Sequence, residues 1–240
     1  MKILSIDTSS NVCGVSILED ENLICKLDTN TGRTHSENLM PMIDEALKKA
    51  ELNPTDINLI VCDIGPGSFT GIRIGVATAK AFSDSLNIPS VGISSLETLA
   101  FGMMSFGKYV CSMIDCKNDN CYFALYEKKN DALETLIEPQ AESVEAALAI
   151  LNSYSCDTLD NAQIAFVGDG TEVYKTEISQ TFENAEFLSS EFNILNSEAL
   201  ALAGLSKFNS GIELDEVLPL YLKKPQAQRQ LEEKENQQLD

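Results

Sequence analysis

Short apolar runs separated by polar turns open the chain. The runs KILSIDT, VCGVSIL and NLICKLD lie within residues 2–28, and the polar segments SSN and EDEN separate them. Runs of this length that are rich in β-branched residues and bounded by turn-forming residues are typical of strands. The pattern therefore predicts three consecutive strands joined by tight connections.

A helical pattern follows over residues 36–51, SENLMPMIDEALKKAE. Its apolar residues recur every three or four positions, which places them on one face of a helix. The residues on that face are Leu39, Met42 or Ile43, Ala46, Leu47 and Ala50. We expect Ser36 to cap this helix, and Pro41 to lie near its first turn or to kink it.

The segment INLIVCDIG, residues 57–65, is largely apolar and predicts a strand that is buried on both faces. Two glycines flank a proline after it, and Ser68 follows, so a helix is predicted from Ser68 to about Leu86. The segment IPSVGIS, residues 88–94, predicts another strand. The first half thus has the order strand, strand, strand, helix, strand, helix, strand.

The second half repeats the beginning of the first. At an offset of 108 residues, KYVCSMIDCKNDNCYFALYEKK matches the start of the chain in its apolar pattern and at four identities. The identical pairs are Ile6 and Ile114, Asp7 and Asp115, Cys13 and Cys121, and Glu19 and Glu127. Helices are then predicted over 143–154, near 171–179 and over 197–208, with a strand within 162–170. Such self-similarity indicates a duplicated domain.

Two halves of this kind, each with an aspartate at the end of its first strand, resemble the actin-like fold of actin and the sugar kinases. We therefore predict an α/β protein of two duplicated actin-like (ribonuclease H-like) subdomains, each a mixed sheet flanked by helices. The N-terminal subdomain is predicted over residues 1–100, the C-terminal one over 101–222, and a mobile tail without apolar periodicity over 223–240. A likeness of fold fixes no function.

The charge of the chain bears on its partners. Its formal net charge is −20, and residues 131–191 hold 13 acidic residues against one basic residue, Lys175. Affinity for nucleic acids comes mainly from Lys and Arg side chains that neutralise phosphates. We therefore expect a partner to make most of any contact with a nucleic acid.

The remaining composition indicates a cytoplasmic protein. No run of 18 apolar residues predicts a membrane-spanning helix, and the N-terminus lacks the pattern of a signal peptide. The seven cysteines form no CxxC pair, and most lie in apolar runs, so buried reduced thiols are expected. The single histidine, His35, is too little for a dedicated zinc site, and a capping or turn role is expected for it.

Two segments are candidates for phosphate chemistry. The turn IDTSS offers backbone N–H groups and hydroxyls, and its aspartate can hold a metal; the alternative is an ordinary capped turn. The loop GPGSFTG lacks the lysine of a Walker A loop and the spacing of a dinucleotide fingerprint, so it is interpreted first as the start of a helix. The weak nucleotide-binding candidates are Asp7, Thr8, Ser9, Gly67 and Ser68. In the matching turn of the second half, IDCKND, bulky Lys117 makes a two-sided phosphate clamp incomplete.

Small residues form a stripe along the helix that follows GPGS. Gly71, Gly75 and Ala79 recur every four positions, with Thr78 beside them and with Ile74 and Phe82 as large residues on the adjacent face. Glycine in a helix costs up to about 1 kcal/mol relative to alanine, so two glycines call for a close approach of another element. That element lies either inside the domain or in a second chain.

Several stretches resemble the TsaB (YeaZ) family, and the resemblance covers the first 126 residues closely. They are ILSIDTSSNVCGVSI, RTHSENLMPMIDEAL, GPGSFTGIRIGVATAKAFSDSLNIPSVGISSLETLA and IDCKNDNCYFALY, with GDG and PLYLKK fitting the weaker second half. The resemblance implies an actin-like fold and a cytoplasmic role in making threonylcarbamoyladenosine beside the anticodon of tRNA. It also implies that the chain is no enzyme, and that it supports the catalytic subunit TsaD.

The resemblance further implies the partners and the contact surface. The implied partners are TsaD in a heterodimer, the ATPase TsaE, and a second copy of the chain, with tRNA contacted indirectly. No cofactor or metal is implied for the chain alone, and ATP or ADP with Mg is expected only in the complex. Pairing is implied through the helices at about 36–51 and 68–86. The partner-binding residues expected there are Leu39, Ile43, Leu47, Gly71, Ile74, Gly75, Thr78, Ala79 and Phe82. The alternative function is a nucleotide-binding or hydrolytic enzyme.

Overall fold

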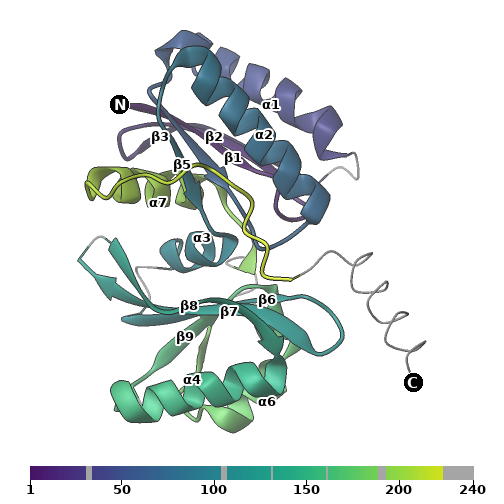
Figure 1. Ribbon diagram of the computed structural model, residues 1–240, viewed down its shortest axis with the longest axis vertical. Coiled ribbons are helices and arrows are strands. Elements are labelled where there is room, and N and C mark those ends of the chain that lie inside the picture. The colour runs from purple at the N-terminus through teal and green to yellow at the C-terminus, as the bar shows by residue number, and fades with distance from the viewer. Residues whose placement is uncertain (31–33, 104–106, 131, 161, 189–192, 224–240) are drawn as a thin grey trace, which may run out of the picture.

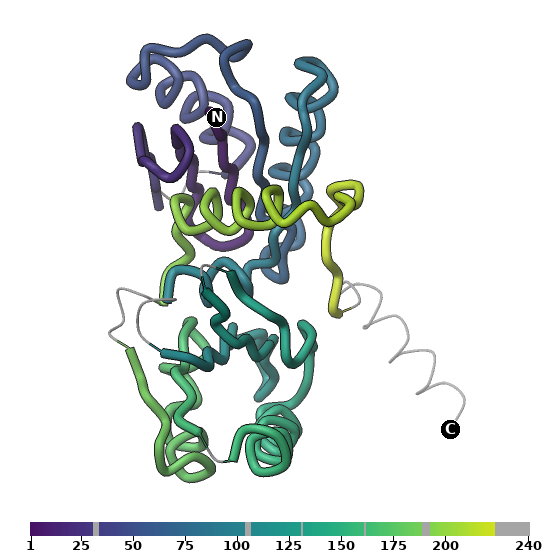
Figure 2. The backbone as a smooth tube through the Cα atoms, turned by 90° about the vertical axis from the view of Figure 1, so that its left-hand side faces the viewer, coloured from purple at the N-terminus to yellow at the C-terminus, as the bar shows by residue number. Residues whose placement is uncertain are grey.

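Two five-stranded sheets, one from each half of the chain, are stacked with helices between and outside them (Figure 1). The computed structural model describes residues 1–30, 34–103, 107–130, 132–160, 162–188 and 193–223. A view turned by 90° shows the same two bodies one above the other (Figure 2).

The first sheet follows the predicted order of elements. Its strands lie in the order β3-β2-β1-β4-β5, with β1, β2 and β3 antiparallel and with β4 and β5 parallel to β1. The strands are β1 (Lys2–Asp7), β2 (Cys13–Glu19), β3 (Asn22–Thr29), β4 (Leu59–Asp63) and β5 (Ser90–Ile93). The helices α1 (His35–Lys49) and α2 (Phe69–Leu86) lead into β4 and β5. The predicted succession of strands and helices is confirmed.

The second sheet has the same topology, with the order β8-β7-β6-β9-β10 and the same strand directions. Its strands are β6 (Tyr109–Asp115), β7 (Asn120–Lys129), β8 (Ala132–Ser143), β9 (Ile164–Val167) and β10 (Glu186–Phe187). The helix α4 (Val144–Thr158) takes the place of α1, and α5 (Asp169–Val173) with α6 (Lys175–Thr181) takes that of α2. The predicted fold of two duplicated subdomains is confirmed, since the 108-residue offset carries β1 and β2 onto β6 and β7.

Two helices exchange sides between the sheets. The helix α3 (Ser95–Phe101) follows the first sheet in sequence but packs on the second, through Leu96 and Leu99. The helix α7 (Ser197–Asn209) follows the second sheet but packs on the first, through Leu200. The two helices contact each other between the sheets. The predicted division into residues 1–100 and 101–222 therefore assigns each of these helices to the half that it does not cover.

Alternation along the strands separates the two faces of the first sheet. Ile6 and Cys62 point towards α1 and α2, whereas Ile3 and Val61 point towards α7. Gly204 lets α7 approach closely, because a Cβ there would lie 2.4 Å from Val61 side-chain carbons. The first sheet is thus buried on both faces, as the apolar run of β4 predicts.

The start of α1 differs from the prediction. Thr34, not Ser36, is the N-cap, and its hydroxyl and backbone N–H both donate to Oε2 of Glu37, at 2.8 and 3.1 Å. Glu37 therefore decides the boundary by completing a capping box with Thr34. Pro41 lies inside the helix, in its second turn, and is exposed. The cap of α2 is Ser68, as predicted, and its Oγ accepts the Gly71 N–H at 3.2 Å.

The sequence analysis misses α3, β8, the two-residue strand β10 and a short 3-10 helix at Pro54–Asp56. The helix α3 has only seven residues, which is too short for a clear helical period. The strand β8 lies at the edge of its sheet and is mostly half-buried or exposed, so its polar residues and Pro139 obscure the alternation.

A C-terminal strap, residues 212–222, runs back along α2. Val217 is buried in the core beneath α1 and α2, and Leu220 donates its N–H to the Ile64 carbonyl at 2.8 Å. The ring of Tyr221 packs on Phe69, with centroids 4.8 Å apart. The predicted tail, residues 223–240, lies outside the described residues except for Lys223.

None of the seven cysteines forms a disulfide, and five of them are buried, as predicted for most. Cys116 is half-buried and Cys156 is exposed. Over the described residues, no helix combines the length and the apolar character that crossing a membrane requires.

Candidate functional site

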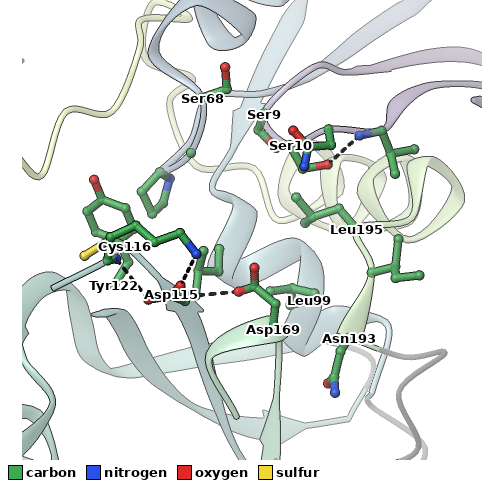
Figure 3. Close-up of a pocket in the computed structure, with 17 residues that line it drawn as sticks. Ser9, Ser10, Ser68, Leu99, Asp115, Cys116, Tyr122, Asp169, Asn193 and Leu195 are labelled. Atoms are coloured by element: carbon green, nitrogen blue, oxygen red, sulfur yellow. Dashed lines mark hydrogen bonds and ion pairs between the residues drawn. The ribbon is translucent and has the colours of Figure 1, made fainter. Parts of the chain in front are cut away.

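A cleft lies where the ends of β1 and β6 face each other, between the two sheets. Its volume is about 570 Å³. The first turn (residues 7–10, after β1) and the start of α2 form one wall, and the second turn (residues 115–119, after β6) forms the other (Figure 3). Apolar side chains from α3 and from the segment before α7, Leu99, Ile194 and Leu195, lie between these walls.

The first turn is bonded to itself and to α2. Ser9 donates its N–H and its hydroxyl to Oδ1 of Asp7, at 2.8 and 2.7 Å. Thr8 donates its hydroxyl to the Gly71 carbonyl at 2.7 Å. The first three residues of the turn, Asp7, Thr8 and Ser9, are at most 2% exposed. The groups that were expected to meet a phosphate are therefore already paired inside the chain.

The loop before α2 closes this turn from the other side. Ser68 donates its N–H to the Ser9 carbonyl at 2.6 Å. A Cβ on Gly67 would lie 2.1 Å from that carbonyl oxygen, so the two backbones are in contact. A nucleotide phosphate or its metal would have to break these hydrogen bonds to reach Asp7. The residues of the closed first turn thus do not fit a phosphate as they stand.

The nucleotide-binding candidates divide into two groups. Ser9, Gly67 and Ser68 line the cleft, whereas Asp7 and Thr8 lie behind its wall. Nucleotide binding by these residues stays a prediction.

The second turn lines the cleft, and it contains both a carboxylate, Asp115, and an ammonium group, Lys117. Lys117 forms an ion pair with Oδ2 of Asp115 and donates its backbone N–H to Oδ1 at 2.9 Å. Tyr174 donates its hydroxyl to the same Oδ1 at 2.8 Å. Asp169 Oδ1 accepts the Asp115 N–H at 3.0 Å (Figure 3). This turn therefore holds two carboxylates and an ammonium group side by side.

The pKa values of Asp115 and Asp169 are shifted in opposite directions. Burial pushes the pKa of Asp115 upwards, but the hydrogen bonds from Lys117 and Tyr174 outweigh it and hold the pKa below its ordinary value. Burial raises the pKa of Asp169. Asp115 is thus the more stable anion of the two.

The small-residue stripe of α2 packs inside the chain. A Cβ on Gly71 would lie 1.9 Å from the Thr8 carbonyl oxygen, and one on Gly75 would lie 2.4 Å from the Thr8 hydroxyl. Ala79 is fully buried in the core beneath α1 and α2. The element that approaches the stripe closely therefore lies inside the domain, which is one of the two predicted alternatives.

The residues expected at the partner surface differ in exposure. Six of the nine are buried in the chain itself: Leu39, Ile43, Leu47, Gly71, Gly75 and Ala79. The other three, Ile74, Thr78 and Phe82, are half-buried and follow one another every four residues along α2. We call these three residues the docking stripe, and their contact with a partner stays a prediction.

His35 takes a structural position. Its Nε2–H donates to the Ser10 carbonyl at 2.8 Å, which ties the start of α1 to the first turn. Its ring also lies against α2, since a Cβ on Gly71 would be 3.0 Å from the His35 ring carbon Cδ2. Within the described part of the chain, no group of three or more His, Cys, Asp or Glu side chains is arranged to hold a metal ion.

Sequence reasoning missed several residues of these walls. Asp63 lies beside the first turn, and Tyr174 bonds to the second. Asp169, which also bonds to the second turn, lies in the GDG segment, which the sequence left open as a nucleotide contact or an ordinary turn. For Asp63 a signal existed, because it ends a strand that was predicted to be buried. Met40, on α1, is 51% exposed and was missed because its neighbours in the helical pattern are core residues.

Comparisons with known proteins agree on one family. A family model described as TsaD, tRNA N6-adenosine threonylcarbamoyltransferase, matches residues 29–231. The tRNA threonylcarbamoyladenosine biosynthesis protein TsaB of Bacillus subtilis (strain 168) is 31% identical over 230 residues, which are 95% of this chain and 96% of that protein. The TsaB protein of Escherichia coli (strain K12) is 30% identical over 148 residues, 58% of this chain and 64% of that protein.

Solved structures agree on the fold. YeaZ from Pseudomonas aeruginosa matches with a TM-score of 0.76 and 23% identity, over 92% of this chain and 99% of that one. The ROK hexokinase from Thermus thermophilus matches with a TM-score of 0.54 and 11% identity, over 88% of this chain and all of that one. The match to Bacillus subtilis TsaB over nearly the whole length, together with the family model, identifies the chain as a member of the TsaB family, within the group that the TsaD model describes.

Proposed function

We propose that the chain serves in the biosynthesis of threonylcarbamoyladenosine in tRNA, as a non-catalytic subunit that docks on a TsaD-type partner. The similarity to TsaB, which extends over 95% of the chain, supports the pathway. One feature of each half supports the non-catalytic role. The first turn is closed by its own hydrogen bonds, and the ammonium group of Lys117 in the second turn is paired with Asp115.

The closed first turn is the observation that carries the non-catalytic role. Catalysis needs groups that can meet a substrate, and the Asp7 carboxylate and the Ser9 N–H are buried and bonded to each other. The second turn offers Lys117, but its ammonium group is paired with Asp115. The only histidine, His35, is used to hold the first turn.

The docking surface is proposed on the helix pair α1 and α2, which lies on the outer face of the first sheet (Figure 1). The docking stripe supplies two large apolar side chains, Ile74 and Phe82, around Thr78. Met40 adds an exposed apolar side chain on the neighbouring helix. Apolar side chains that remain partly exposed on a helix face are the usual core of a protein interface.

The charge of the chain supports an indirect contact with tRNA. A net charge of −20 opposes binding of a polyanion, so the partner would supply the basic surface. We place this role in the cytoplasm, and ATP or ADP with Mg at the level of the complex, where the ATPase TsaE would join the pair. The same docking stripe would serve a homodimer, in competition with TsaD.

Introducing one positive charge into the docking stripe tests the proposed docking surface. Thr78→Arg should reduce the affinity for a TsaD-type partner at least tenfold, because an unpaired charge would be buried at the interface. Ser153→Arg, at an exposed position of α4 in the other half, makes the same change of charge and should pair as the wild type does.

Light scattering of the mixed chains gives the affinity, and circular dichroism checks that each variant is folded. Normal pairing by folded Thr78→Arg would refute the docking surface. Gly75→Arg is unsuitable as a test, because the packing of Gly75 on Thr8 means that this change would disturb the fold itself.

A further inference from the structure

Two buried aspartates end neighbouring strands behind the cleft. β1 and β4 are parallel, and Ile6 lies opposite Cys62 in their register. The next residues, Asp7 and Asp63, are therefore neighbours across strands that lie about 4.8 Å apart. Asp7 is 1% exposed, and Asp63 is not exposed at all. We call them the carboxyl pair.

Asp63 has one paired and one unpaired oxygen. Its Oδ1 accepts the Gly65 N–H and the Ser95 hydroxyl, both at 2.7 Å. Its Oδ2 is buried and has no hydrogen-bond partner among the described residues. A carboxylate spreads its charge over both oxygens, so an ionised Asp63 would leave half of that charge without solvation. A protonated Asp63 has no such charge to solvate.

Among the described residues, no basic side chain bonds to either carboxyl group of the pair. Asp28 of β3 adds a negative charge near Asp7 and forms an ion pair with Lys26 at 3.3 Å. The buried thiol of Cys62 precedes Asp63. His35 of α1 acts to lower the pKa of Asp7, but burial has the larger effect and raises this pKa.

The basic side chains of the elements packed around β4 point to other partners. On α2, Arg73 donates to the Tyr221 hydroxyl at 2.7 Å, and Lys80 pairs with Glu216. On α7, Lys207 donates to the Gly92 carbonyl at 3.2 Å. The acid on α3, Glu97, interacts with Lys207.

We propose that the carboxyl pair is a site for one proton, which Asp63 holds at neutral pH, and that loss of this proton at higher pH loosens the closed first turn. In the second turn, the ammonium group of Lys117 offsets the negative charge of Asp115. In the carboxyl pair, a proton instead removes one of the two negative charges. Like-charged carboxyl groups at this separation do not both ionise readily.

The carboxyl pair lies where three elements of the fold meet, so a change in its charge would affect all of them. Asp63 bonds to Gly65, in the loop before α2, and to Ser95, the first residue of α3. Asp7 bonds to Ser9, whose carbonyl accepts the Ser68 N–H. The pair therefore connects the first turn, the start of α2 and the start of α3. A second negative charge would act on all three connections together.

The sign of the pH dependence follows from the burial. Burial, and then the charge of Asp7, raise the pKa of Asp63 well above its ordinary value. The folded chain then holds a proton that the unfolded chain has lost, so stability falls as pH rises from the ordinary aspartate pKa towards the folded one. Over this window the equilibrium constant for unfolding rises by up to about tenfold per pH unit for one linked proton.

Carboxyl ¹³C NMR of the wild-type chain, labelled at its aspartates, tests the proton directly. We expect one aspartate signal at the chemical shift of a protonated acid at pH 7, and we expect it to be missing from Asp63→Asn. Asp7→Asn should lower the pH at which this signal titrates, because it removes the neighbouring charge. Ionisation of every aspartate in the folded wild type at pH 7 would overturn the proposal, and so would a titration that Asp7→Asn leaves unchanged.

Thermal unfolding from pH 5 to pH 8 tests the consequence. The melting temperature of the wild type should fall relative to that of Asp63→Asn as pH rises, because the variant has no proton to lose. Asp84→Asn, an exposed aspartate on α2, is the matched control and should follow the wild type. Parallel curves for the wild type and a folded Asp63→Asn would contradict the linkage. The measurements need no partner, so their failure would leave the docking proposal standing.

Discussion

Each half of the molecule places two aspartates at or just beyond the carboxyl ends of neighbouring parallel strands, and the surroundings of the two pairs differ. In the first half, Asp7 and Asp63 are buried behind the wall of the cleft. In the second half, Asp115 and Asp169 line the cleft, and Lys117 pairs with Asp115. The same topology thus holds one pair of acids with an ammonium group and the other without one.

This difference shows how a duplicated fold diverges. The strand ends bring the acids together in both halves, but the connections that follow decide their chemistry. In the first half, the loop before α2 closes over the turn through Gly67 and Ser68. In the second half, the short helices α5 and α6 take the place of α2, and the turn lines the cleft. The first half thereby gains a rigid helix pair on its outer face, and the second keeps a polar wall.

Gly71→Ala should break the closed first turn with the largest effect. Alanine normally stabilises a helix by about 1 kcal/mol relative to glycine. Here its Cβ would meet the Thr8 carbonyl oxygen at 1.9 Å, so we expect the opposite sign and a loss of about 3 kcal/mol or more. Urea unfolding gives the free energy of unfolding.

The control for this change is Gly102→Ala at the end of α3. The nearest atom to a Cβ there is 3.5 Å away, which is an ordinary contact. This variant should unfold within about 1 kcal/mol of the wild type. If Gly71→Ala were as stable as this control, the first turn would not be closed on α2 as described.

Ser95→Ala should have the next largest effect. It removes the hydroxyl that donates to Asp63 Oδ1, and the Gly65 N–H becomes the remaining donor to this oxygen. Loss of a buried hydrogen bond costs about 1–2 kcal/mol. The loss should grow as pH rises, because an ionised Asp63 needs the donor more. A loss that shrank between pH 6 and pH 8 would argue against the carboxyl pair.

Tyr174→Phe should affect the second turn less. The tyrosine hydroxyl donates to Asp115 at 2.8 Å, but this turn has Lys117 as a second source of hydrogen bonds. We expect a loss of about 1 kcal/mol at neutral pH. The pKa of Asp115 should rise, which NMR titration of its carboxyl carbon can follow. An unchanged pKa would show that Lys117 alone sets it.

Lys117→Met should have the smallest effect on stability. The Lys117 side chain is 82% exposed, so solvent screens its ion pair with Asp115 and the variant should lose little stability. The folded pKa of Asp115 lies below its ordinary value, so the contribution is present above the ordinary pKa and is lost as pH falls through the folded pKa. The two halves should thus respond to opposite ends of the pH scale. Acid unfolding of the variant and the wild type in parallel would reveal the difference.

The sequence predicts the fold more fully than it predicts which residues pack against each other and which remain available to a partner. The 108-residue repeat and the apolar runs identify both sheets, because strand alternation and duplication leave direct traces in the order of residues. The stripe of Gly71, Gly75 and Ala79 does predict close packing, but the partner of its two glycines is Thr8, which no periodicity reveals. The contact of Ser68 with Ser9 likewise joins residues far apart in sequence, so the closed turn could not be predicted from either segment.

The measurement that tests the proposed function most directly is threonylcarbamoyl transfer to tRNA with purified components. The chain alone, a TsaD-type partner alone and the two together would be assayed with the same threonylcarbamoyl donor. We predict product only with both chains, and much less when Thr78→Arg replaces the wild type. Product from this chain alone would contradict a non-catalytic subunit, and full activity of the partner alone would contradict any need for it.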